Sequence, residues 1–381
     1  MTLIDIEDDV FLDADITIDT LRILNDATLS VTQVGTGDFT VADPGGILVE
    51  GNLLVANDRL IDATAGAVTI GPGGIYQADP DAVGLVTATL EAGSITLQGA
   101  APDEGLLGGT MALSGSMNVV IDGDLHLQSS VDDDGGKGCD TPPDLSSTDN
   151  AQVRVMGTLA IGKCAEVNIT SSEPVILDGD MQNQSTFPMR FDWDAGELQM
   201  NGVAQTIEAA GEDRGPWPIG LEDNFAFQTL TLAAGTIVDV DDVFDNQQDG
   251  VVACDEALYV DTLNVRAGAV LLTDGCRVYY NTLINDGAVP GLGSDVLQIL
   301  PPIPADLNGD GKVDAFDLAF LLGSWGPCPA PCAPEGEPAT CPASCTPDDH
   351  MEICRADISG DCEVEAFDLA QLLGSWGPFT E

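Results

Sequence analysis

Two acidic segments near the C-terminus contain residue types, at a regular spacing, that could bind a metal ion. In the first, side-chain oxygens recur at positions 1, 3, 5, 9 and 12 of a twelve-residue loop: Asp306, Asn308, Asp310, Asp314 and Asp317, with Lys312 contributing only its backbone carbonyl at position 7. Calcium prefers six to eight oxygen ligands in flexible geometry, which this spacing provides. We therefore predict a calcium loop, with Gly311 at its sharp turn and Val313 in a small core.

The second segment repeats this pattern 51 residues later, at Asp357. Its ligand positions are Asp357, Ser359, Asp361, Glu365 and Asp368, with Glu363 at the backbone-carbonyl position. Cys362 replaces the turn glycine, and a residue with a side chain adopts that conformation less readily. We expect two calcium sites, of which the second binds more weakly.

A nearly identical apolar segment follows each loop, at residues 315–327 and 366–378. Each segment predicts a short amphipathic helix that ends at a Gly-x-x-Gly-Pro signal. Prolines at 302 and 304 exclude a helix before the first loop. The two helical segments differ at one position, Phe320 against Gln371, which places Phe320 near the surface. The pairs that are apolar in both copies are predicted to form the core: Leu321 with Leu372, and Trp325 with Trp376.

A duplicated loop and helix with Asp at position 12 resembles the type I dockerin module. The match covers residues 306–378 and is interrupted by a Cys- and Pro-rich insert at 328–354. The resemblance implies calcium at the ligand positions of both loops, and calcium-dependent attachment to a cohesin-like or other surface protein. Positions 10 and 11, Ala315-Phe316 and Ala366-Phe367, depart from the polar pairs usual in that family, so the partner stays open.

The first 298 residues have the sequence pattern expected of many short β-strands. From Asp9 to about Asn285, runs of Val, Ile, Leu and Thr alternate with Gly, Asn and Asp, and helical periodicity is absent. A motif T-L-x-h-x-x-[DGC]-[AT]-x-h, where h is aliphatic, begins at Thr20, Thr158, Thr229 and Thr262. It predicts a strand, a turn and a second strand, and stacked units of this kind form a β-solenoid. An antiparallel β-sandwich is the alternative.

The predicted fold class is therefore mostly β. A parallel β-helix or β-solenoid-like body occupies residues 1–298, a Pro-rich linker residues 299–305, and a small α-helical dockerin-like module residues 306–378. The succession of short strands and turns in the body resembles the parallel β-helix regions of secreted bacterial adhesins and polysaccharide-active proteins.

Ten cysteines favour disulfides and an oxidising compartment. Cys139 and Cys164 are 25 residues apart and Cys254 and Cys276 are 22 apart, each close to one coil of a β-helix. Equivalent positions on adjacent coils are about 4.8 Å apart, so either pair could join neighbouring coils. Six further cysteines lie in the tail, where zinc is the alternative to disulfides: Cys328, Cys332, Cys341, Cys345, Cys354 and Cys362.

The charge balance excludes one class of partner. With 64 acidic against 11 basic residues, the formal net charge is −53, a field that repels nucleic acid and attracts cations. No stretch is long and apolar enough to span a bilayer. The N-terminus does not have the composition of a signal peptide, yet the cysteines argue for export. We expect an extracellular or cell-surface protein whose signal was removed or whose chain begins part-way through a longer product.

Catalysis by the body is the alternative to a purely binding role. Asp192, Asp194 and Glu197 surround Trp193, and paired carboxylates beside a sugar-stacking ring are typical of glycoside hydrolases. Such clusters arise freely in so acidic a chain, so a turn with one buried aromatic is favoured. A lyase needs a basic groove, which the composition does not indicate. Residues 131–140 could hold a cation or form an exposed loop. We expect a non-catalytic body that could bind polysaccharide, with a polysaccharide-degrading hydrolase or lyase as the alternative.

Overall fold

The computed structural model describes residues 3–8, 10–12, 16–31, 39–41, 46–56, 58–78, 86–100, 107–129, 139, 141–193, 195–247, 254–301, 304–309, 311–327, 356–359 and 363–378. Strands account for 48% of the described residues and helices for 9%, so the protein is mostly β. The chain forms two compact units, which are described separately. One contains Met1–Asp213 and Gly220–Gln298, and the other contains Arg214–Ile219 and Ile299–Glu381.

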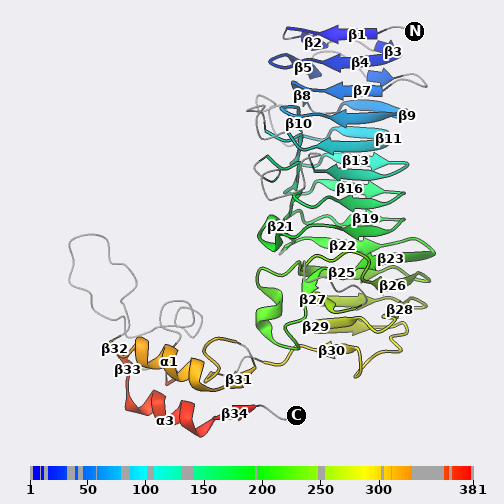
Figure 1. Cartoon of the computed structure of the whole chain (residues 1–381). Coiled ribbons are helices and arrows are strands. Elements are labelled where there is room, and N and C mark those ends of the chain that lie inside the picture. Colours follow the sequence, from blue (N-terminus) through cyan, green and yellow to red (C-terminus); the bar gives the residue numbers. More distant parts are fainter. Residues whose placement is uncertain are drawn as a thin grey trace. The chain divides into compact units, whose positions relative to one another are not determined.

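The first unit is a parallel β-helix in which successive coils stack from β1 to β30 (Figure 1). Its strands form a 22-stranded and an 8-stranded sheet, and the larger sheet contains two ladders. One ladder contains β3 (Ile16–Ile18), β6 (Phe39–Val41), β9 (Leu60–Ile70), β11 (Thr89–Gln98), β13 (Asn118–Ile121), β16 (Gln152–Val155), β19 (Val175–Leu177), β22 (Glu197–Met200), β25 (Phe227–Leu232), β27 (Glu256–Val265), β29 (Arg277–Asn285) and β30 (Val296–Gln298).

The other ladder of the large sheet shares the second halves of β9 and β11. It contains β1 (Leu3–Ile6), β4 (Thr20–Ile23), β7 (Gly46–Val49), β14 (Leu125–Gln128), β17 (Leu159–Ile161), β20 (Met181–Asn183), β23 (Ala204–Glu208), β26 (Ile237–Asp241) and β28 (Val270–Leu272). The small sheet contains β2 (Val10–Leu12), β5 (Thr28–Val31), β8 (Asn52–Val55), β10 (Ile75–Ala78), β12 (Thr110–Leu113), β15 (Asp144–Ser147), β18 (Glu166–Ile169) and β21 (Phe191–Asp192).

Short elements interrupt this regularity. They are the 3-10 helices η1 (Pro188–Arg190) and η2 (Pro218–Leu221) and the strand β24 (Gly211–Glu212), which pairs antiparallel with β27. Elsewhere in the described part of this unit the strands of the two ladders and of the small sheet pair in parallel, which confirms the solenoid-like prediction and makes the sandwich alternative wrong.

The predicted strand–turn–strand units are confirmed at their turns. The seventh position of the motif has a left-handed backbone at Asp26, Gly235 and Gly268, with φ of 67°, 82° and 78°. Asp and Gly adopt this conformation more readily than other residues, which explains why they recur there. Each turn leads from one ladder into the next strand of the coil.

Side chains alternate between inward and outward directions along each strand, and the inward apolar side chains form the core. Inward residues at the same register stack along the second ladder, as Leu21, Ile47, Val68, Ile95 and Leu125 do on successive coils. All five side chains are buried. Since each coil covers the apolar face of its neighbour, the core is continuous along the stack.

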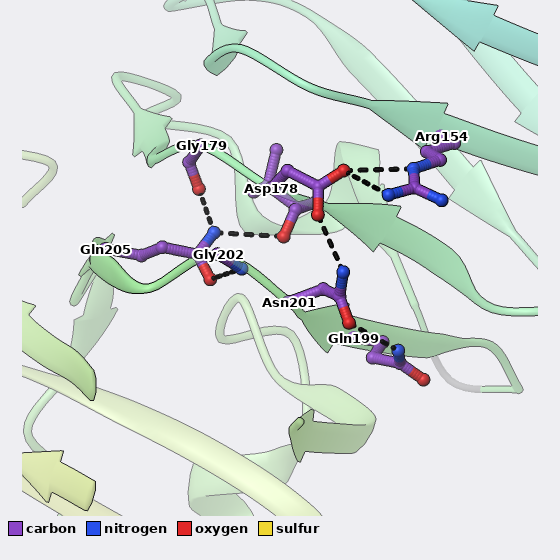
Figure 2. Close-up of polar contacts among 8 residues, drawn as sticks. Arg154, Asp178, Gly179, Gln199, Asn201, Gly202 and Gln205 are labelled. Atoms are coloured by element: carbon purple, nitrogen blue, oxygen red, sulfur yellow. Dashed lines mark hydrogen bonds and ion pairs between the residues drawn. The ribbon is translucent and has the colours of Figure 1, made fainter. Parts of the chain in front are cut away.

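Polar side chains connect neighbouring coils outside this core (Figure 2). The Arg154 guanidinium contacts Asp178 Oδ2 through Nε at 2.9 Å and through a terminal nitrogen at 2.8 Å. Asn201 donates to Asp178 Oδ1 at 2.7 Å, and the amide of Gln205 donates to the carbonyl of Leu177 at 2.9 Å. These contacts fix the register of successive coils.

Two disulfides join coils, as the cysteine spacing predicted. Cys139 is bonded to Cys164 with a Cα separation of 5.1 Å, and Cys254 is bonded to Cys276 with a Cα separation of 4.3 Å. Both separations agree with neighbouring coils of a β-helix.

The described part of the second unit contains the helices α1 (Ala315–Gly323) and α3 (Ala366–Gly374), each directly after a predicted loop (Figure 1). Two short antiparallel pairs cross between the repeats. They are β31 (Lys312–Val313) with β34 (Gly377–Pro378), and β32 (Gly326–Pro327) with β33 (Glu363–Val364). No helix in the described part of the chain is long and apolar enough to cross a membrane.

The core of this unit follows the 51-residue repeat. Its buried apolar side chains are Ala305, Leu307, Val313, Leu321, Ala356, Val364 and Leu372. Leu321 and Leu372 are fully buried, as expected, but Trp325 and Trp376 are 49% and 47% exposed, so the prediction that both tryptophans belong to the core is wrong. Each lies one residue beyond the C-cap of its helix, outside the helical turns that carry the buried leucines.

Candidate metal-binding loops

The position-12 carboxylate organises the first loop. Asp317 lies in the first turn of α1, is fully buried, and accepts hydrogen bonds from three backbone N–H groups of its own loop. These come from Leu307 at 2.7 Å and Asn308 at 3.1 Å, both to Oδ1, and from Asp314 at 2.7 Å to Oδ2. The loop is therefore wrapped around this one carboxylate.

Position 1 closes the other side of the same loop. Asp306 accepts the N–H of Gly309 on Oδ1 and of Gly311 on Oδ2, both at 2.8 Å. Gly311 has φ of 80°, and a Cβ there would collide with the ring of Trp217, which belongs to the same unit. Glycine at position 6 is thus required by the turn and by the neighbouring ring.

The remaining positions of the first loop have different roles. Asp314 accepts the N–H of Phe316 at 2.8 Å and so caps α1, which places its carboxylate at the helix N-terminus. Lys312 is exposed on β31, in agreement with a position that offers only its carbonyl. Asp310 lies outside the described residues.

The second loop repeats the arrangement. Asp368, also fully buried, accepts the N–H of Ser359 and of Glu365, both at 2.8 Å. The Ser359 hydroxyl donates to Asp357 Oδ1 at 3.1 Å, and Glu363 is exposed on β33. Asp361 and Cys362 lie outside the described residues, so the reason given for a weaker second site stays a prediction.

The two loops thus share one architecture. In each, backbone N–H groups donate to a buried position-12 carboxylate. The position-1 carboxylate accepts backbone N–H groups in the first loop and the Ser359 hydroxyl in the second. Donor sets made only of oxygen suit hard cations such as calcium. The residues present fit such an ion, and its charge would offset the repulsion among the carboxylates.

The structure does not support the glycosidase candidate in the body. Trp193 is fully buried, and its ring centroid lies 5.5 Å from that of Phe191 and 5.3 Å from that of Phe227. A buried ring cannot stack on a sugar, which agrees with the favoured interpretation of a core aromatic. Glu197 begins β22 within the sheet, whereas Asp194 and most of residues 131–140 lie outside the described part of the chain.

A pocket of about 540 Å³ lies on the body, but its described lining offers neither a carboxylate nor an aromatic ring besides imidazole. Its polar lining residues are Thr96, His126, Gln128, Ser129, Lys163 and Gln184. Acid–base hydrolysis of a glycoside uses two carboxyl groups, so this pocket offers no such pair.

Sequence reasoning missed one group of chemically capable residues. The carboxylates of Glu208, Asp242 and Glu256 converge in the body, although each residue belongs to a different strand or turn. They share no local motif, so no sequence signal marked them.

Comparisons with known proteins add no identification. A scan against protein-family models gave no match, and searches of curated proteins and of solved structures gave none either.

Proposed function

We propose that the protein is an exported calcium-binding protein whose dockerin-like C-terminal repeats attach it, in a calcium-dependent manner, to a cohesin-like protein of a cell surface or extracellular assembly. The β-solenoid body is the attached cargo and is non-catalytic in this proposal. Two bound calcium ions are expected in the tail, one in each loop.

One observation carries the proposal: a fully buried aspartate occurs at position 12 of both loops. Burying an ionised carboxylate costs several kcal/mol, roughly, unless hydrogen bonds and a counter-charge compensate. Asp317 and Asp368 have backbone donors, but none of the ion pairs identified among the described residues involves either side chain. A cation in each loop would supply the compensating charge.

The helices offer an apolar surface for a protein partner. On α1, Phe316 is 72% and Phe320 45% exposed, and on α3 Phe367 is 57% exposed. Exposure of Phe320 agrees with the prediction made from its replacement by Gln371. Exposed aromatic rings are frequent anchors of protein interfaces. Phe316 and Phe367 occupy equivalent positions in the two copies, whereas Phe320 is present in the first copy alone.

The disulfides and the charge support export. Disulfides persist in oxidising compartments, and both described pairs join coils of the body. A net charge of −53 keeps the chain dispersed and favours accumulation of divalent cations around it.

The experiment that tests this function uses the full chain, because Arg214–Ile219 packs with the tail as part of one unit. Binding to a panel of purified cohesin modules is measured by surface plasmon resonance in calcium and in EGTA. We expect binding in calcium that is abolished by EGTA and by the double substitution Asp306→Ala and Asp357→Ala. The matched control is Glu363→Gln, which removes an acid from the second loop at a carbonyl-only position and should leave binding intact.

Two outcomes would contradict the proposal. Binding that persists in EGTA would remove calcium from the attachment mechanism. Failure of every cohesin to bind the calcium-loaded chain would exclude the cohesin-like partner. The polysaccharide-active enzyme remains the alternative function, and no observation on the described residues favours it.

A further inference from the structure

Three acidic side chains converge in the body, in a part of the sequence that precedes both tail loops. Glu208 ends β23, Asp242 directly follows β26, and Glu256 begins β27. One carboxylate oxygen from each lies within 4.8 Å of the other two. The three residues are only 5%, 6% and 1% exposed. Their convergence results from coil stacking, because Glu208 is the register partner of Asp241 on the next coil.

Backbone donors of the chain after β26 hold one oxygen of each carboxylate. These hydrogen bonds run from Val243 and Phe244 to Glu208 Oε1, both at 2.8 Å, from Gln247 to Glu256 Oε1 at 2.8 Å, and from Asp255 to Asp242 Oδ2 at 3.2 Å. The carboxylates are thus positioned by the fold and do not simply project into solvent.

Two of the three carboxylate oxygens that remain are buried and have no hydrogen-bond partner among the described residues. They are Asp242 Oδ1 and Glu256 Oε2. Beside them, Asn246 is 3% exposed, and its amide nitrogen donates to the carbonyls of Asn183 at 2.9 Å and Ser185 at 2.7 Å. Its Oδ1 is therefore a third buried oxygen without a described partner. Buried acceptors of this kind are rare in folded proteins unless water or an ion satisfies them.

Among the described residues, no positive side chain forms an ion pair with the cluster. Burial raises the pKa of Glu256 to about 8, and the charges that act on it are those of Asp242 and Asp255. Burial likewise raises the pKa of Glu208 to about 7, against backbone donors that lower it. None of the ion pairs identified in the described part of the chain includes Glu208, Asp242 or Glu256. An uncompensated group of buried carboxylates is strongly unfavourable.

We propose that Glu208, Asp242 and Glu256 bind a calcium-sized divalent cation in the body, at a site separate from the two tail loops. One oxygen from each carboxylate lies within 4.8 Å of the other two, and calcium–oxygen distances of about 2.3–2.6 Å allow one ion to contact all three. A set of protein oxygens held by the fold is more typical of calcium than of magnesium, which usually keeps several waters. The ion would tie β23, β26 and β27 together beside the Cys254–Cys276 disulfide.

The test uses the full chain carrying Asp306→Ala and Asp357→Ala, here called the tail-silenced chain. Its calcium binding is measured by isothermal titration calorimetry at pH 8, and the ions per chain are counted by native mass spectrometry. We expect one calcium ion to remain bound and the unfolding temperature of the body to rise in calcium relative to EGTA. This result does not depend on whether the tail loops bind calcium, so it fails or succeeds separately from the proposed function.

Substitution at the cluster distinguishes a metal site from a set of protonated carboxyls. Adding Glu256→Gln to the tail-silenced chain should weaken calcium binding at least tenfold and remove the calcium-dependent rise in unfolding temperature. The matched control is Asp286→Asn, which removes one exposed charge and should leave both unchanged. A tail-silenced chain that binds no calcium overturns the proposal. So does binding that is as tight with Glu256→Gln as without it, because the ion would then lie elsewhere.

Discussion

Replacing Asp317 by alanine should unfold the first repeat of the tail, even in the absence of calcium. The carboxylate accepts three backbone N–H groups, from Leu307, Asn308 and Asp314, at 2.7–3.1 Å. The hydrogen bond from Leu307 is buried and the other two are partly buried. Removing the acceptor leaves these donors dependent on whatever water can enter the loop.

The expected loss can be worked from these three bonds. A net contribution of about 1–1.5 kcal/mol for each bond, at the upper end of the usual range, gives a destabilisation of about 3–4.5 kcal/mol. A hydrophobic core as small as that of this module rarely supplies more than about 3–5 kcal/mol, so a loss of this size is enough to unfold the repeat. Bound calcium stabilises the folded wild type by a further ~2.7 kcal/mol when the free calcium concentration is a hundred times the dissociation constant. The Asp317→Ala variant should lose this stabilisation too.

The assay is hydrogen exchange followed by mass spectrometry on full-length chains, read on peptides from Ala305 to Gly323, in EGTA and in calcium. Asp317→Ala should expose these amides in both conditions, and calcium should not restore their protection. Asp317→Asn should give an intermediate loss in EGTA, because an amide oxygen keeps some acceptor capacity but has no charge. The reasoning is refuted if Asp317→Ala retains wild-type protection in EGTA. It is refuted separately if calcium protects that variant as it protects the wild type.

Three further predictions concern the body and the helix surface. Trp193→Ala should destabilise the body by about 3–5 kcal/mol, because it removes a fully buried ring from an aromatic cluster; denaturant unfolding that changes by less than about 1 kcal/mol would contradict this. Burial and the neighbouring Glu166 raise the pKa of Asp144 to about 6, so the folded state binds this proton more tightly than the unfolded state and loses stability as pH rises from about 4 to 6. Asp144→Asn should therefore raise the free energy of unfolding at pH 7 by about 1–2 kcal/mol. It should also flatten the dependence of stability on pH between about 4 and 6. Thermal unfolding that shows neither effect would contradict an unfavourable interaction between Asp144 and Glu166. Phe320→Gln should leave calcium affinity unchanged while weakening attachment to the partner, and unfolding of the calcium-loaded tail would instead assign the ring to the core.

The body could be predicted from sequence because a solenoid carries its signal locally. Each coil repeats a short aliphatic alternation and a turn, so the motifs at Thr20 and Thr229 report the same unit. Cysteine spacing added the coil length, since residues one turn apart face each other on neighbouring coils. Predictions of this kind depend on neighbours along the chain and on a constant repeat, and both were present.

Features that depend on tertiary packing were not predictable in the same way. Trp325 and Trp376 recur in both repeats, but recurrence shows an equivalent position and not a buried one. The packing of Trp217 against Gly311 joins residues far apart in sequence. The cluster around Glu256 arises where three strands or turns meet, and in a chain with 64 acidic residues no single glutamate attracts notice.

The central claim is that the two tail loops bind calcium, and a calorimetric calcium titration of the full chain tests it most directly. Asp306→Ala should remove the tighter tail site, Asp357→Ala the weaker one, and the double substitution both, while Glu363→Gln should bind as the wild type does. A double variant that binds as many calcium ions as the wild type, with the same affinities, would contradict the account.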